Sequence, residues 1–144
     1  MTTQQHLAFV FPGQGSQQIG MLQELVEKHA IAKQTFEEAS TVLGYDMLAL
    51  TSTGPEEKLN QTEYTQPALL TTGVAIYRVL EQIKNIKPAI MAGHSLGEYS
   101  ALVCAGSLSF TDAVTLVAER GRLMQAAVPQ GVGAMAAIIG LEPA

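Results

Sequence analysis

The residues best suited to chemistry in this sequence lie in the segment Gly93-His94-Ser95-Leu96-Gly97. It fits the Gly-x-Ser-x-Gly pattern, in which a serine on a sharp turn between a strand and a helix attacks acyl groups. The glycines are needed because side chains there would collide with the neighbouring strand and helix. The Leu96 amide would open the helix, where it can donate to an oxyanion. A serine between glycines is often only a turn, but the predicted strand and helix around this one favour a nucleophile.

Arg120 is a second candidate, because it interrupts the apolar face of a helix predicted from Thr111 to about Val128. The apolar residues on the same stripe are Ala113, Leu116, Val117, Leu123, Met124 and Ala127. A buried guanidinium needs acceptors to offset its lost hydration. One explanation is an internal salt bridge, with candidate partners Asp46, Glu98 and Asp112; the other is a planar fork that binds a substrate carboxylate. On the opposite, polar face we predict a solvent-exposed pair between Glu119 and Arg122.

Gln14 lies in a glycine-rich loop, Gly13 to Gln17, that follows a predicted strand over Leu7 to Phe11. If this strand pairs with the one before Ser95, both loops open at the carboxyl edge of the sheet, and Gln14 would face the serine. A flexible connection or a phosphate-binding loop are the alternatives, and a lone Gly-x-Gly is weak evidence for a nucleotide site.

Strands and helices alternate along the chain, which predicts an α/β fold with a parallel sheet. Apolar periodicity predicts two helices between Met21 and Gly44, and a long helix that Gln66-Pro67 opens and that ends near Lys84. Residues 88–93 are expected to form a fully buried strand, and residues 96–105 a helix that is apolar almost all round. Ser109 or Thr111 would cap the last helix. Breaks at 129–133 indicate a domain edge, followed by a strand over 134–141.

Composition limits the possible functions. The 144 residues are 47% hydrophobic and 15% charged, with a net charge of -5, so the chain offers no basic patch to nucleic acid or to an anionic membrane. Its single cysteine, Cys104, excludes an internal disulfide and a cysteine metal cluster. No metal site or bound redox cofactor is indicated. The N-terminus lacks the features of a signal peptide, and we expect a cytoplasmic location.

Four motifs together resemble the signatures of malonyl-CoA:acyl carrier protein transacylases. They are Phe11-Pro12-Gly13-Gln14-Gly15-Ser16-Gln17, Thr65-Gln66-Pro67-Ala68, Gly93-His94-Ser95-Leu96-Gly97-Glu98-Tyr99-Ser100-Ala101 and Arg120-Gly121. The resemblance covers essentially the whole chain. It implies that malonyl-CoA acylates Ser95 and that the phosphopantetheine thiol of acyl carrier protein then collects the malonyl group, as in type II fatty acid synthesis. It further implies that Gln14 and the Leu96 amide are the oxyanion donors, that Arg120 binds the malonyl carboxylate and that Gln66 supports the substrate site.

The resemblance also implies a domain plan. Residues 1–130 would form the N-terminal part of a hydrolase-like body, a parallel sheet with helices on both faces. Residues 131–144 would begin a ferredoxin-like insert, cut short at its first strand. The family's general base is a histidine expected beyond Ala144, and none of His6, His29 and His94 is a credible substitute. We therefore expect an incomplete chain.

Three alternative functions are plausible from the sequence. A serine esterase or thioesterase would keep the nucleophile but gain little from Arg120. A non-catalytic half-domain would bind carrier protein or a complementary fragment without turnover. The acyltransferase modules of polyketide synthases also resemble this sequence, but an N-terminus directly before the first strand favours a stand-alone enzyme.

Overall fold

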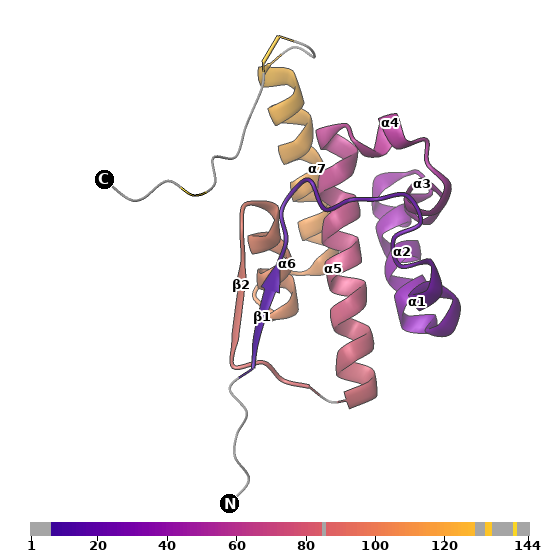
Figure 1. Ribbon diagram of the computed structural model, residues 1–144, viewed down its shortest axis with the longest axis vertical. Helices are drawn as coiled ribbons and strands as arrows, with labels where there is room; N and C mark the ends of the chain where they lie inside the picture. The colour runs from indigo at the N-terminus through magenta and orange to yellow at the C-terminus, as the bar shows by residue number, and fades with distance from the viewer. Residues whose placement is uncertain (1–6, 85, 129–131, 134–139, 141–144) are drawn as a thin grey trace, which may run out of the picture.

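The computed structural model describes residues 7–84, 86–128, 132–133 and 140. Over these residues it is a mixed α/β structure with a small parallel sheet and many helices. In chain order the elements are β1 (Ala8–Phe11), α1 (Gln23–Lys28), α2 (Ala30–Leu43), α3 (Met47–Thr53), α4 (Glu56–Leu59), α5 (Thr62–Lys84), β2 (Ile90–Gly93), α6 (Leu96–Cys104) and α7 (Phe110–Ala127). Helix α5 runs through the middle of the molecule, between the strands on one side and α1 to α4 on the other (Figure 1).

The two described strands pair in parallel, with Ala8 opposite Ile90 and Phe11 opposite Gly93. The sequence predicts that the loop after β1 lies near Ser95 only if these two strands pair, and they do pair. Because the strands are parallel and end in register, the loops that follow them leave the sheet at the same edge. The segment around Gln14 and the turn that carries Ser95 are therefore neighbours.

Helix α5 is the centre of the core. One apolar cluster joins it to α2, α6 and α7 through residues such as Leu70, Leu96 and Val117, and a second joins it to α2, α3 and α4 around Phe36 and Met47. Phe36 and Met47 have no exposed surface, and complete burial of such side chains contributes roughly 1.5–3 kcal/mol each. The packing fixes α5 and α7 relative to each other, and these helices carry two of the predicted site residues.

The segment before α5 contains structure that the periodicity did not predict. Helices α3 and α4 are short, and Gly54-Pro55 separates them, so neither supplies the repeated turns that make a helical pattern visible. Asp46 begins α3, where its carboxylate accepts the amide of Ala49 at 2.8 Å. Helix α5 begins at Thr62, so Pro67 lies inside the helix instead of opening it. Gln66 and Pro67 are both buried, and the packing of α5 against α7 and α2 offsets the hydrogen bond that the proline removes.

The prediction that residues 88–93 form a fully buried strand was wrong, and the helix predicted over 96–105 lies only partly in the core. Strand β2 alternates between exposed and half-buried residues, and Ile90 is 64% exposed. A strand is fully buried only when both faces of its sheet are covered, and among the described helices only α6 packs extensively against β2. Helix α6 buries Leu96 and Ser100 on one face but leaves Leu102 exposed on the other. It is thus a helix at the surface of the described structure.

The predicted stripe on α7 was also partly wrong. The buried residues of this helix are Phe110, Ala113, Val114, Val117 and Gly121. Leu116, Leu123, Met124 and Ala127 are exposed. The helix is turned so that its glycine faces α5, because a Cβ at Gly121 would lie only 2.6 Å from the carbonyl oxygen of Thr62. Arg120 accordingly lies half-buried at the margin of the packed face. The cap at Ser109 was predicted correctly, since its hydroxyl accepts the amide of Asp112.

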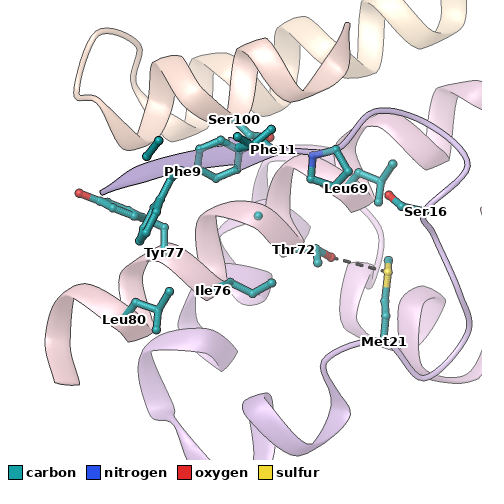
Figure 2. A pocket seen from close by; sticks show the side chains of 14 residues that line it. Phe9, Phe11, Ser16, Met21, Leu69, Thr72, Ile76, Tyr77, Leu80 and Ser100 are labelled. Atoms are coloured by element: carbon teal, nitrogen blue, oxygen red, sulfur yellow. Dashed lines mark hydrogen bonds between the residues drawn. The ribbon is translucent and has the colours of Figure 1, made fainter. Parts of the chain in front are cut away.

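An apolar cavity of about 380 Å³ lies between β1 and α5 (Figure 2). The ring of Phe9 packs edge-on against Tyr77 at 6.0 Å between centroids. Phe11 is buried beside Gly73, where a Cβ would come within 3.3 Å of its ring. These contacts hold β1 against α5 and so fix the strand end from which the Gln14 loop departs. Ser95 does not line this cavity.

Several predictions lie outside the described residues. They concern His6, the boundary near residue 131 and, apart from Gly140, the strand over 134–141. No helix in the described part of the chain is long and apolar enough to cross a membrane.

Candidate active site

Ser95 lies on a sharp turn between β2, which ends at Gly93, and α6, which begins at Leu96. Its dihedral angles are φ 53° and ψ -110°, and the amide of Gly97 donates to the carbonyl of His94 at 2.9 Å. This combination matches a type II′ turn, in which the position that Ser95 occupies normally holds glycine. The serine is therefore held in a strained conformation with its side chain exposed, as a nucleophile elbow requires.

The two glycines of the motif are there for steric reasons. A Cβ on Gly93 would overlap the backbone of Gly97, and a Cβ on Gly97 would overlap the carbonyl of Phe11 at the end of β1. Both obstacles are backbone atoms, which cannot rotate away as a side chain can. The close approach of strand, turn and helix that the motif predicted is confirmed.

The backbone amide of Leu96 is the first of α6. The next two amides are occupied, because Gly97 donates to His94 and Glu98 donates to Ser95. Leu96 has no acceptor for its own N–H within the described ranges. Its side chain is fully buried, which anchors the turn in the core. A free amide beside the serine, at the positive end of a helix, is suited to stabilise an oxyanion.

Arg120 reaches from α7 to the serine. Its Nη2 donates to Ser95 Oγ at 3.0 Å, and its Nη1 donates to Gln66 Oε1 at 2.6 Å. The guanidinium carbon lies 5.6 Å from the centre of the Tyr99 ring. The structure therefore brings together three residues predicted from separate motifs, on α5, α6 and α7.

Gln66 is the fixed member of this group. Its side chain is completely buried in the first turns of α5, and its Nε2 contacts Met124 Sδ at 3.2 Å. A buried amide with both ends occupied has one orientation, so it holds the Nη1 side of Arg120 in place. The alternative salt bridge is not formed: within the described residues, Arg120 has no ion pair with Asp46, Glu98 or Asp112. The separate pair between Glu119 and Arg122 is present at 2.6 Å, as predicted.

The Gln14 loop lies against the elbow but does not bond to the serine. A Cβ at Gly13 would be 3.1 Å from the carbonyl oxygen of His94, which shows how closely the loop approaches. The exposed Gln14 side chain instead donates to Thr62 Oγ1 at 3.4 Å, at the start of α5. Gln17 similarly donates to Asn60 Oδ1 at 2.9 Å. These bonds attach the loop to α5 beside the elbow.

The two described histidines do not serve Ser95. His94 is next to it in sequence, but its Nδ1 lies toward Gly13, 3.4 Å from where a Cβ on that glycine would be. His29 lies between α1 and α2, and Figure 1 shows these two helices on the opposite side of α5 from the strands. Neither forms a hydrogen bond with Ser95. In the described part of the chain, moreover, no three His, Cys, Asp or Glu side chains are grouped so as to hold a metal ion.

Sequence reasoning did not identify two residues of the group. Tyr99 supports the guanidinium, and the only available signal was its place in the serine motif, four residues after Ser95. The predicted apolar stripe includes Met124, yet this residue is 39% exposed and contacts Gln66. Met124 lies one helical turn after Arg120, and this spacing was the sequence signal that could have placed Met124 beside Arg120.

Comparison with known proteins agrees with this geometry. The family model described as "Acyl transferase domain" matches residues 8–142. The malonyl CoA-acyl carrier protein transacylase of Escherichia coli K12 is 64% identical over 137 residues, which are 95% of this chain and 44% of that protein. The transacylase of Bacillus subtilis 168 is 54% identical over 138 residues, covering 94% of this chain and 43% of that protein.

Solved structures give the same result. An acyl carrier protein S-malonyltransferase from Vibrio cholerae superposes with a TM-score of 0.90 at 64% identity, covering 95% of this chain and 45% of that one. A malonyl-transacylase in complex with a type II PKS acyl-carrier protein superposes with a TM-score of 0.85 at 59% identity, covering 88% and 41%. The chain thus spans less than half the length of these relatives. Since the family model extends over nearly all of its residues, including the serine turn and the arginine that contacts it, the chain belongs to the acyl transferase domain family.

Proposed function

We propose that this chain supplies the nucleophile, the oxyanion donors and the carboxylate-binding arginine of a malonyl-CoA:acyl carrier protein transacylase acting in fatty acid biosynthesis. Ser95 is the nucleophile, Gln14 and the Leu96 amide are the oxyanion donors, Arg120 binds the malonyl carboxylate, and Gln66 positions Arg120. The relatives named as malonyl transacylases support the assignment of substrate and partner.

The reaction divides into two acyl transfers. Ser95 Oγ attacks the thioester carbonyl of malonyl-CoA, the carbon–sulfur bond breaks, and the serine proton passes through a base to the departing CoA thiolate. The phosphopantetheine thiol of acyl carrier protein then attacks the malonyl ester, and its proton returns to Ser95. Each transfer passes through an oxyanion beside the Leu96 amide. Loss of one such donor commonly costs about 3–4 kcal/mol of transition-state stabilisation.

The observation that carries the proposal is the contact between Arg120 and Ser95. A guanidinium 3.0 Å from the nucleophile, held by a buried amide, puts a positive charge where a short acyl group would lie. Arginine binds carboxylates in a planar, charge-assisted manner, so the site favours an acyl group that ends in a carboxylate. The malonyl group is such an acyl group.

The residues that the structure describes do not supply a general base for Ser95. His94 and His29 do not contact Ser95, and the relatives are more than twice as long as the aligned region. We therefore assign the base to a histidine further along the enzyme. From the resemblance of its motifs, we also propose that residues 1–130 belong to a hydrolase-like body with helices on both faces of the sheet, and that residues 131–144 begin a ferredoxin-like insert. The reaction needs no bound cofactor, with the CoA thioester as a substrate, and we place it in the cytoplasm.

The intact mass of the chain, before and after incubation with malonyl-CoA or acetyl-CoA, tests the assignment. We expect a malonyl ester on Ser95 from malonyl-CoA, located by peptide mapping, and little or no acetyl ester. Arg120→Ala should abolish the preference for malonyl-CoA. Arg122→Ala is the matched control, because this arginine lies on the same helix and, among the described residues, bonds only to Glu119. If the chain stays unlabelled, the same assay on the chain completed by its relatives' C-terminal region decides whether Ser95 is the acylated residue.

A serine esterase or thioesterase is the alternative, but the same contact argues against it. A hydrolase of neutral esters has no use for a cation next to its nucleophile, and it would lose nothing in Arg120→Ala. Equal use of acetyl-CoA and malonyl-CoA by the wild-type chain would favour that alternative.

A further inference from the structure

We infer that Ser95 and the carboxylate of the substrate compete for the same donor, Nη2 of Arg120, so that the substrate itself releases the nucleophile. The inference rests on the proposed function, because it assumes that Arg120 binds the malonyl carboxylate. It adds a second role for Arg120, which is to restrain Ser95 when no carboxylate is bound.

The two ends of the guanidinium are held differently. Nη1 donates to Gln66, which is completely buried and is itself bonded to Met124. Nη2 donates to Ser95 Oγ, and Ser95 is exposed. A ligand from solution can therefore reach Nη2 and displace Ser95 without disturbing the buried contact. The Tyr99 ring 5.6 Å from the guanidinium carbon helps to keep the group in place during this exchange.

The shape of the substrate requires the exchange. Ser95 must approach the carbonyl carbon of the malonyl group, and Arg120 must bind the carboxylate at the other end. A methylene carbon separates these two groups, so the malonyl unit lies between the two side chains. In the structure these side chains touch at 3.0 Å. Binding of the carboxylate to the exposed side of Arg120 therefore separates Nη2 from Ser95 Oγ.

Release of Ser95 has a chemical consequence. While Oγ accepts a hydrogen bond from a cation, one of its lone pairs is engaged and its nucleophilicity is reduced. An acyl-CoA without a carboxylate leaves this bond intact and meets a restrained serine. Selectivity then has two sources that act in the same direction, the affinity of Arg120 for a carboxylate and the freedom that binding gives to the nucleophile.

The competition predicts whether removal of the Ser95 hydroxyl strengthens or weakens the binding of malonate, and this can be measured without catalysis. Sodium malonate is titrated into the isotopically labelled chain by NMR, with sodium chloride holding the ionic strength constant. In Ser95→Ala the competing acceptor is gone, and malonate should bind about three- to tenfold more tightly than in the wild type, as expected for the loss of one competing hydrogen bond. Ser107→Ala is the matched control, an exposed serine on the turn after α6, and should leave the affinity unchanged.

The outcomes separate the inference from the proposed function. If Arg120→Ala loses malonate binding but Ser95→Ala binds no more tightly than the wild type, the function stands and the competition is refuted. Weaker binding in Ser95→Ala would also refute it, because the hydroxyl would then be a ligand for the carboxylate. If Arg120→Ala binds malonate as well as the wild type does, or if neither the wild type nor Ser95→Ala binds it, Arg120 is not the carboxylate site and both proposals fail.

Discussion

Replacing Ser95 by glycine and, separately, by alanine measures the strain stored in the turn that carries this residue. Both substitutions remove the hydroxyl and its bond to Arg120, so any difference in stability between them comes from the backbone. Alanine must keep the dihedral angles of the serine, φ 53° and ψ -110°, whereas glycine adopts them without a steric penalty. We expect the glycine variant to be the more stable of the two.

The size of the difference follows from two opposing contributions. A residue held in such a sparsely populated region costs of order 1–3 kcal/mol. In the opposite direction, glycine lowers the free energy of unfolding by about 0.5–1 kcal/mol relative to alanine, because it has more conformational freedom in the unfolded chain. The net advantage of Ser95→Gly over Ser95→Ala is therefore about 0.5–2 kcal/mol. In a chain of this length that corresponds to a difference in Tm of about 2–6 °C.

Circular dichroism during thermal and urea unfolding measures this difference directly. The same pair of substitutions at Ser107 is the control, since Ser107 is exposed and does not have a positive φ. There the order should reverse, with alanine at least as stable as glycine. The strain argument is refuted if glycine is no more stable than alanine at position 95, or if glycine is favoured equally at both positions.

Further predictions concern the packing around the site. Gly97→Ala should destabilise the chain by about 1–3 kcal/mol in urea unfolding, because its Cβ would meet backbone atoms. Gly73→Ala should cost less than about 1 kcal/mol, because its Cβ would meet the side chains of Phe11 and Ser100 at 3.3 Å or more and the helix gains propensity. Burial raises the pKa of the Cys104 thiol to about 12, and the nearby Arg78 only partly offsets this. Iodoacetamide should therefore alkylate Cys104 much more slowly in the folded chain than in urea at pH 8, and equal rates would contradict the burial. Because the pKa of Cys104 is higher in the folded chain than in the unfolded chain, its contribution to the free energy of unfolding is complete at pH values below the ordinary thiol pKa. This contribution is lost as the pH rises toward 12. Glu38→Gln weakens the partly buried 2.8 Å pair with Arg78 and should lower the free energy of unfolding by about 1 kcal/mol. Added salt should not destabilise the wild type by as much, because a partly buried pair is screened less than an exposed one.

The elbow could be predicted from sequence because its constraints are local. A short apolar run, two glycines around a serine and an apolar helix occupy fewer than twenty consecutive residues, and the steric reason for each glycine was confirmed. The degree of burial of β2 could not be predicted in the same way. A strand rich in apolar residues signals that something covers it, but not whether the covering elements belong to the same stretch of chain. The exposure of Ile90 reflects which elements the described chain provides.

The contact between Arg120 and Ser95 depends on packing that no local pattern encodes. Periodicity put Arg120 on the same stripe as Leu123 and Met124, which are exposed, so the predicted face was turned relative to the observed one. What sets the observed rotation is Gly121, which allows α7 to approach the backbone of Glu63 so closely that a Cβ would lie 2.7 Å from its Cα. With that close approach, the neighbouring Arg120 lies beside Gln66 of α5, and its free end reaches the serine. In the Arg120-Gly121 pair, the glycine thus positions the helix and the arginine uses that position, which is why the two residues belong together as one motif.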